Sequence, residues 1–278
     1  MCWFTRKNVN FHILKRGIKI NTISILGCGW LGLPLAVNFI NRGYHVKAST
    51  TSENRLPELS EQKIEPYIIE LEKLPGNIYA FLQSDILIIS IPSKNINGFK
   101  SLVKEIEKSG IEKVIFVGST SIYEDNNKII YEDDCEESSA SPLFIIENLL
   151  RDSGKFRTTI LRFGGLIGYS RNPGRFFANG RPVANPEANI NMIHLDDCVQ
   201  IIDQIIKQSV WGDVFNCCAD THPTKRDFYT QAAKNIGAAV PNFEESPVEQ
   251  YKIISNQKVK RLLNYEFNYP DLMKINFS

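Results

Sequence analysis

The chain has 278 residues, of which 43% are hydrophobic and 23% are charged, and its formal net charge is +1. This balance suits a globular protein with a full core and gives no sign of the basic surface that nucleic acid requires. No apolar run reaches the roughly 18 residues of a membrane span, and six scattered cysteines without a C-x-x-C pair predict a reduced, cytoplasmic protein with no metal site.

The first 19 residues are basic and lack the apolar core and small-residue cleavage site of a secretory signal. We interpret residues 1–19 as an extension ahead of the first strand, with a transit peptide as the alternative.

The next segment has the order strand, tight turn and helix. An apolar run over 23–26 leads into glycines with the spacing G-x-G-x-x-G, and a helix-like segment follows over 33–40. In this order the first glycine permits the turn, the second lets a pyrophosphate approach the backbone, and the third lets the helix pack close to the strand. We predict that a dinucleotide binds here, at Gly27, Cys28, Gly29, Trp30, Leu31 and Gly32. The alternative is a turn without a ligand; a redox role for Cys28 is a further, weaker interpretation.

The end of the second predicted strand, 43–48, bears on the choice of cofactor. The polar residues Thr50, Thr51 and Ser52 at its end carry no carboxylate, and Arg55 follows three residues later. A site for NAD usually places Asp or Glu here to bind the ribose 2′-hydroxyl, whereas hydroxyls and an arginine suit a 2′-phosphate. We therefore predict NADP, with NAD possible, and a plain polar loop as the alternative.

Strands and helices continue to alternate along the chain. Further strands are predicted at 64–70, 85–91, 113–117, 158–163 and 214–217, and helices at 98–109, 141–151, 196–207, 224–236 and 256–263. The strand 85–91 is continuously apolar and ends at Pro92 and Ser93, where ligands lie in open α/β sheets. The pattern predicts an α/β fold, a doubly wound parallel (Rossmann) sheet over 20–163. We predict that residues 164–278 form a smaller substrate lobe and that 192–220 within them return to the sheet. Residues 164–191 are predicted to be a long functional loop without regular elements.

Four motifs then point to one family. They are G-S-T-S-I-Y at 118–123, L-R-F-G-G-L-I-G at 161–168, M-I-H-L-D-D at 192–197 and V-F-N at 214–216. In this order, after the glycine turn, they resemble the extended and atypical short-chain dehydrogenases/reductases, the NAD-dependent epimerase/dehydratase superfamily. The resemblance covers roughly residues 20–269.

The resemblance implies roles for two polar side chains. Ser119 would orient the substrate oxygen, and a hydroxyl at the carboxyl edge of a central strand is well placed to do so; local backbone capping is the alternative. Tyr123 would line the pocket, or pack at the strand end. The family implies structural roles for His194 and Asp196, which set the loop and cap the next helix.

Two arginines carry open interpretations. Arg162 and Arg171 could each reach an anionic substrate group, and ion-paired or solvated side chains are the alternative.

The chain departs from the family at its usual acid. The family's Tyr-x-x-x-Lys pair precedes a glutamate; aligning that glutamate with Glu147 puts Ser139 and Leu143 at the two positions. The tyrosinate mechanism is therefore in doubt, and any hydride transfer would rely on Ser119, with Tyr123 or a water as acid.

Three functions follow. The first is an NAD(P)-dependent oxidoreductase or epimerase-type enzyme, a monomer or homodimer, acting on a small carbonyl or nucleotide-sugar-like substrate. The second is a non-catalytic NADP-binding sensor or regulator. The third is a hydroxyacid or 6-phosphogluconate-type dehydrogenase, which would need a largely helical C-terminal domain.

Overall fold

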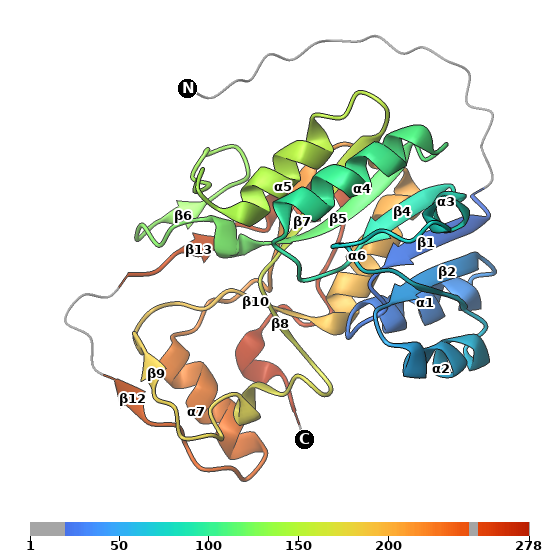
Figure 1. The fold of residues 1–278 in the computed structure, drawn as a ribbon. Helices are drawn as coiled ribbons and strands as arrows, with labels where there is room; N and C mark the ends of the chain where they lie inside the picture. Colours follow the sequence, from blue (N-terminus) through green and yellow to red (C-terminus); the bar gives the residue numbers. More distant parts are fainter. Residues whose placement is uncertain (1–19, 245–249, 278) are drawn as a thin grey trace.

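The computed structural model describes residues 20–244 and 250–277. Within these residues the central sheet has seven parallel strands, and Figure 1 shows the sheet within the fold. Their order across the sheet is β11-β7-β5-β4-β1-β2-β3. The strands are β1 (Thr22–Leu26), β2 (His45–Thr50), β3 (Glu65–Ile68), β4 (Ile86–Ile89), β5 (Lys113–Ser119), β7 (Arg157–Phe163) and β11 (Val214–Cys217). The Rossmann sheet predicted from the sequence is thus confirmed. The predicted extension at 1–19 lies outside the described residues.

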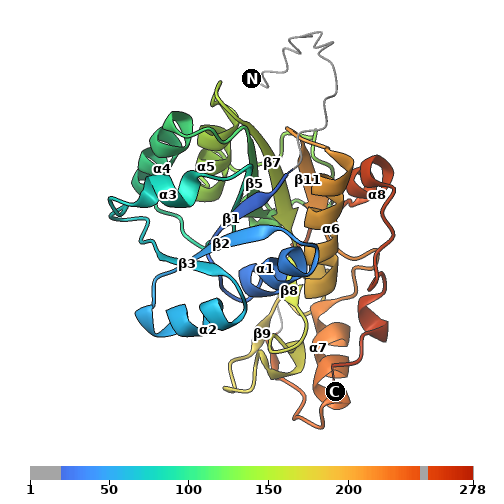
Figure 2. The same ribbon diagram turned by 90° about the vertical axis from the view of Figure 1, so that its right-hand side faces the viewer.

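Helices cover both faces of this sheet. The helices are α1 (Gly32–Asn41), α2 (Leu56–Glu61), α3 (Ile78–Leu82), α4 (Ile96–Lys108), α5 (Pro142–Arg151), α6 (Leu195–Gln208), α7 (Lys225–Asn235) and α8 (Gln257–Leu263). Figure 2 shows α3, α4 and α5 on one side, and α1, α6 and α8 on the other. Because both faces are covered, the central strand β4 is buried along its whole length, as its apolar sequence predicts. The short helices α2 and α3 were not predicted from the sequence.

The strand order changes direction at β1. The chain runs from β1 outward to β2 and β3, and then returns to β4 on the other side of β1. The connections on the two sides of this point diverge, which leaves a crevice at the carboxyl ends of β1 and β4. The glycine turn, residues 27–32, begins at the carboxyl end of β1 and leads into α1.

The segment 164–191 contains more regular structure than predicted. It holds β8 (Gly165–Ile167), a 3-10 helix (Pro173–Arg175) and β9 (Val183–Ala184). β8 pairs with β10 (Met192–His194), and β9 pairs with β12 (Phe243–Glu244). A further pair joins β6 (Ile129–Ile130) to β13 (Ile253–Ile254). Because the partner strands β10 and β12 lie outside the segment, periodicity within it could not reveal the pairing.

A separate hydrophobic cluster lies outside the sheet, beneath α7 and the C-terminal segment. Its buried members include Ile167, Val183, Phe228, Tyr229 and Leu272. The region mixes helices with short strands, and is therefore not the largely helical domain that a hydroxyacid dehydrogenase would need. Across the described residues, no helix has both the length and the apolar character needed to cross a membrane.

Candidate functional site

The glycine turn has the geometry of a close-approach site. Gly27 has φ +100°, and a Cβ there would lie 2.6 Å from the carbonyl oxygen of Ser90. A Cβ on Gly32 would overlap the carbonyl oxygen of Gly27. Gly29 differs, because a Cβ there would meet nothing within 4 Å. The first and third glycines therefore allow the turn to form, while the second leaves its backbone open to a ligand.

Hydrogen bonds hold this turn against the end of β2. The backbone N–H of Gly27 donates to Ser49 Oγ at 2.9 Å, and that of Cys28 donates to the Ser49 carbonyl at 2.7 Å. The N-terminus of α1 places the positive end of the helix dipole at this turn. The Leu33 N–H donates to the Gly29 carbonyl at 3.0 Å, the Leu35 N–H donates to the Leu31 carbonyl at 3.2 Å, and Pro34 has no N–H. The turn is therefore rigid and suited to bind the phosphates of a dinucleotide.

A cavity of about 350 Å³, here called the first cavity, opens beside the turn. Its walls come from the turn itself, from the ends of β2 and β4, and from the segment after β3. They include Gly27, Cys28, Gly29, Ser49, Thr50, Thr51, Arg55, Ile69, Leu71, Glu72, Ser90, Pro92 and Ser93. The structure thus brings together most of the predicted cofactor residues around one concave surface.

Ser52, Leu31 and Gly32 do not line the first cavity. Ser52 is exposed, and its backbone N–H donates to Thr50 Oγ1 at 3.2 Å. Leu31 and Gly32 are buried where α1 begins. These three positions shape the turn and the strand end from outside the cavity wall.

Cys28 is a buried thiol rather than a reactive one. Burial raises its pKa to about 11, although the nearby Arg55 charge opposes this shift. A thiol with such a pKa carries little thiolate near neutral pH, so the redox interpretation is not supported.

Arg55 lies over the glycine turn. Its Nη1 donates to the Cys28 carbonyl at 2.7 Å, and its Nε lies 3.2 Å from Glu58 Oε2. It lines the first cavity and also a second one of about 560 Å³ on the other side of Gly29. Arg55 is thereby fixed at the place where the sequence predicts recognition of the 2′ position.

Trp30 is a predicted cofactor residue that lines the second cavity and not the first. Trp30 Nε1 donates to Ser170 Oγ at 3.1 Å, and the Arg171 guanidinium lies 4.7 Å from the centre of the Trp30 ring. The segment after β8 is therefore held against the glycine turn. Arg171 makes a cation–π contact here, an arrangement that neither sequence interpretation anticipated.

Ser119 ends β5 and is half-buried. Its Oγ accepts a hydrogen bond from the Ser121 backbone N–H at 3.1 Å, which is the local capping role. A hydroxyl that accepts in this way still has its own proton to donate. The capping geometry therefore leaves Ser119 able to bind an oxygen at the edge of the sheet.

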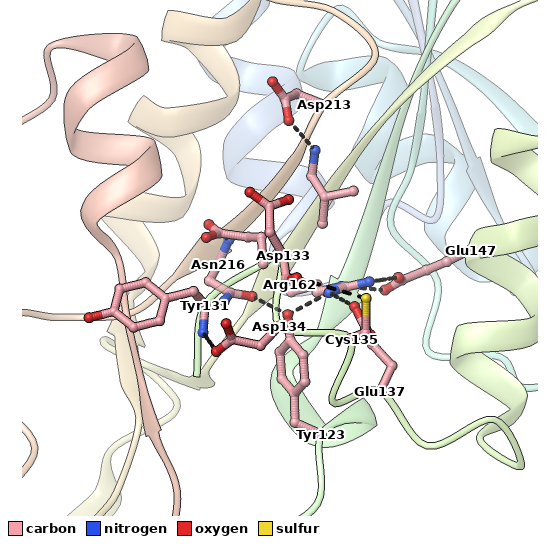
Figure 3. Close-up of polar contacts among 12 residues, drawn as sticks. Tyr123, Tyr131, Asp133, Asp134, Cys135, Glu137, Glu147, Arg162, Asp213 and Asn216 are labelled. Carbon is pink, nitrogen blue, oxygen red and sulfur yellow. Dashed lines mark hydrogen bonds and ion pairs between the residues drawn. The ribbon is translucent and has the colours of Figure 1, made fainter. Parts of the chain in front are cut away.

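Tyr123 is 2% exposed and belongs to a buried polar cluster around Arg162, shown in Figure 3. Its hydroxyl donates to Asn216 Oδ1 at 2.9 Å and accepts from Arg162 Nη1. Burial raises the pKa of this tyrosine well above its usual range. The acid role proposed for Tyr123 therefore requires correction: the phenol is packed, hydrogen-bonded and a weaker acid than a free tyrosine.

Arg162 is the centre of this cluster. It is 1% exposed and forms ion pairs with Glu147 at 2.8 Å and Glu137 at 2.6 Å. Burial raises the pKa of Glu147, and the Arg162 charge opposes that shift. The ion-paired interpretation of Arg162 is correct, because its Nε, Nη1 and Nη2 all donate to partners within the cluster.

The start of α5 explains the unusual acid positions. The helix begins at Pro142, so Ser139 precedes it and is exposed. Leu143 packs against a small apolar cluster that contains Ile122 and Tyr123. The two positions aligned with the family's pair therefore hold an exposed hydroxyl and a packed leucine.

His194 and Asp196 lie where α6 begins. The His194 Nδ1 accepts from the Asp196 backbone N–H at 3.3 Å and so caps the helix. The Asp196 carboxylate accepts from the Tyr169 hydroxyl at 3.0 Å and from the Tyr269 hydroxyl at 3.3 Å. The structural interpretation of this pair agrees with the hydrogen bonding.

Sequence reasoning missed part of the first cavity. Ile69, Leu71 and Glu72 follow β3 and form one wall, and Ser49 anchors the turn. Their place in the sequence could have indicated them, because they lie at or just after the carboxyl end of a predicted strand, where ligands bind in open α/β sheets. The segment carries no motif, however, so only the sheet order reveals that it faces the glycine turn.

No family model matches the chain. Protein YeeZ of Escherichia coli (strain K12) is 30% identical over 265 residues, which cover 90% of this chain and 96% of YeeZ. The structure of a protein from Methylobacillus flagellatus, assigned as an NAD-dependent epimerase/dehydratase, is similar with a TM-score of 0.75 and 25% identity, covering 91% of this chain and 94% of that one. The structure of UDP-glucuronic acid 4-epimerase from Bacillus cereus, in complex with UDP-glucuronic acid and NAD, is similar with a TM-score of 0.74 and 16% identity. The match covers 92% of this chain and 98% of the epimerase.

Proposed function

This chain belongs to the family of Protein YeeZ, within the NAD-dependent epimerase/dehydratase superfamily of short-chain dehydrogenases/reductases, and on that basis we propose that it is an enzyme dependent on a nicotinamide dinucleotide. The first cavity carries the proposal, because its walls combine the open Gly29 with the ends of β2 and β4 at the strand-order switch. This is where open α/β sheets bind dinucleotides. The similar Bacillus cereus epimerase supports the assignment, since its structure contains NAD.

Within this site we assign a preference for NADP to the end of β2. Thr50, Thr51 and Arg55 line the first cavity, and the predicted 2′-OH position carries no carboxylate. A guanidinium recognises a phosphate with several donors, and hydroxyls add further ones. The ion pair with Glu58 offsets part of the Arg55 charge, so the preference should depend on that partner as well.

The proposed reaction is transfer of hydride to or from a carbonyl–hydroxyl pair on a small or nucleotide-sugar-like substrate. When bound, the dinucleotide supplies the hydride-accepting or hydride-donating ring. Ser119 then holds the substrate oxygen through its hydroxyl proton, since its Oγ already accepts from Ser121. Because Tyr123 is packed against Arg162, we assign the proton to a water held at the Ser119 edge.

Binding and turnover must be measured separately. We would titrate the protein with NADPH and NADH by nicotinamide fluorescence, and then follow their consumption with simple carbonyls, and NAD(P) reduction or epimer formation with UDP-sugars. The proposal expects saturable binding together with turnover on at least one substrate. Absence of dinucleotide binding in protein shown to be folded would refute it.

One observation favours a second function. An exposed serine and a packed leucine occupy the positions of the family's Tyr-Lys pair, so the site could bind cofactor without using it. A non-catalytic sensor or regulator would show tight cofactor binding without turnover on any substrate. The two measurements above therefore discriminate between the functions.

A further inference from the structure

A third cavity, of about 400 Å³, lies between the turn after β8, the start of α6 and the C-terminal segment. Its walls include Tyr169, Arg175, His194, Tyr269 and Phe277. It shares no lining residue with the first cavity, and it meets the second cavity at Tyr169 and Ser170. Its volume lies within the range of small-molecule sites, about 300–1,000 Å³.

Flat rings form one wall of this third cavity. The Tyr269 ring centre lies 3.8 Å from that of His194, and the Tyr169 ring centre lies 5.6 Å from that of His194. Both tyrosine hydroxyls donate to the Asp196 carboxylate, at 3.0 Å from Tyr169 and 3.3 Å from Tyr269. These bonds fix the rings in place, so the wall is preorganised to stack against a flat group.

Among the described residues, Arg175 is the one cation that lines the third cavity, beside Ser170, Asn172 and Asn276, whose side chains both donate and accept hydrogen bonds. Within residues 20–244 and 250–277, the exposed Arg175 side chain has no hydrogen bond or ion pair. His194 is 6% exposed, and its Nδ1 accepts the Asp196 N–H, so the neutral ring carries its proton on Nε2 as a donor. The nearby Asp196 carboxylate already accepts from two tyrosines and lines the second cavity instead.

We propose that the third cavity binds a small organic anion with a flat, unsaturated or aromatic body. Arg175 pairs with its carboxylate or phosphate, and the rings of His194 and Tyr269 lie beside its body. A charged donor such as Arg175 favours an anion, and a fixed aromatic wall favours a planar ligand over inorganic phosphate. This site is separate from the dinucleotide site and does not depend on the proposed function.

Four probes test the recognition. Phenyl phosphate, benzoate, neutral benzamide and inorganic phosphate would be titrated into the full chain by calorimetry without dinucleotide. We expect phenyl phosphate or benzoate to bind at least about 10-fold more tightly than benzamide and inorganic phosphate, and the tighter of the two identifies the anionic group. Equal binding of all four, or no binding of either aromatic anion, would overturn the proposal.

Two variants locate the binding. Arg175→Gln should weaken the aromatic anion about 10-fold or more, whereas Arg175→Lys should retain part of the affinity. The matched control is Arg181→Gln, an exposed arginine of the same segment that contacts the Phe177 ring and does not line the cavity. Equal loss in Arg175→Gln and Arg181→Gln would refute the assignment. NADPH titration of each variant, expected to be unchanged, separates this result from failure of the dinucleotide site.

Discussion

Gly29→Ala separates folding from cofactor binding at the glycine turn. A methyl group at this position would meet no heavy atom within 4 Å, and the residue does not have the left-handed φ that strains alanine. The variant should therefore fold with a free energy of unfolding within about 1 kcal/mol of the parent protein. Gly27→Ala is the opposite case, because its φ is +100° and its Cβ would lie 2.6 Å from the Ser90 carbonyl oxygen.

The magnitudes follow from these contacts. For Gly27→Ala, the left-handed backbone costs about 1–2 kcal/mol and the overlap about 1–3 kcal/mol, so a destabilisation of roughly 2–5 kcal/mol is expected. For Gly29→Ala, the methyl group would hold a pyrophosphate away from the backbone and remove one charge-assisted hydrogen bond or more. Each such bond contributes about 1.5–3 kcal/mol, which predicts a loss in dinucleotide affinity of roughly 10-fold to 100-fold.

Urea denaturation and NADPH titration measure the two effects independently. Gly154→Ala is the matched control, since its added Cβ also meets open space and the residue lies far from the turn in sequence. We expect Gly154→Ala to retain both stability and binding. If Gly29→Ala folds normally and binds NADPH as tightly as the parent protein, the dinucleotide does not lie on the glycine turn and the reasoning fails.

Three further predictions concern single side chains. Ser119→Ala should lower NADPH-dependent turnover about 10-fold or more and leave NADPH affinity unchanged in titrations; unchanged turnover would exclude the oxygen-orienting role. Arg55→Ala should weaken the binding of NADP about 10-fold and that of NAD little, while Glu58→Gln should increase the preference for NADP. Equal losses of affinity for both cofactors in Arg55→Ala would refute 2′-phosphate recognition. Arg162→Met should lower the free energy of unfolding by about 3–5 kcal/mol, because Glu147 is left buried without its partner. Burial raises the pKa of Glu147 in the folded state. The stability that comes from protonating Glu147 is therefore present below its unfolded pKa of about 4.3 and is lost as the pH rises through its folded pKa. The loss in free energy of unfolding caused by Arg162→Met should consequently be smaller at about pH 5 than at about pH 7, as measured by urea denaturation.

The central sheet could be predicted because each of its strands carries a local signal. Ile86–Ile89 is apolar at every position and buried at every position. The glycine spacing similarly encodes a turn, since the conformation of Gly27 and the close approach at Gly32 are properties of the glycines themselves. Hydrophobic periodicity and the conformational freedom of glycine depend on neighbouring residues alone, so both can be read from the sequence before the fold is known.

The rest of the site depends on contacts between distant segments. Tyr123 and Arg162 looked available for chemistry, yet Glu137, Glu147 and Asn216 close around them only once the sheet is assembled. The third cavity likewise joins residues more than 70 positions apart. No spacing rule connects such positions. The sequence therefore shows which polar side chains could act in a site, but not which of them form hydrogen bonds or ion pairs with one another.

The buried cluster also bears on the missing acid. Arg162 joins β7 to Glu147 of α5 and to Glu137 before it, and its contact with Tyr123 extends the network to the segment after β5 (Figure 3). A buried arginine with two carboxylate partners is costly to rearrange, because moving either partner leaves a charge unpaired. Tyr123 therefore cannot turn toward the sheet edge without breaking its bonds to Arg162 and Asn216. Ser119 is not part of this network, since its hydrogen bond comes from the Ser121 backbone, and we therefore expect any catalysis at this edge to depend on the serine and on water.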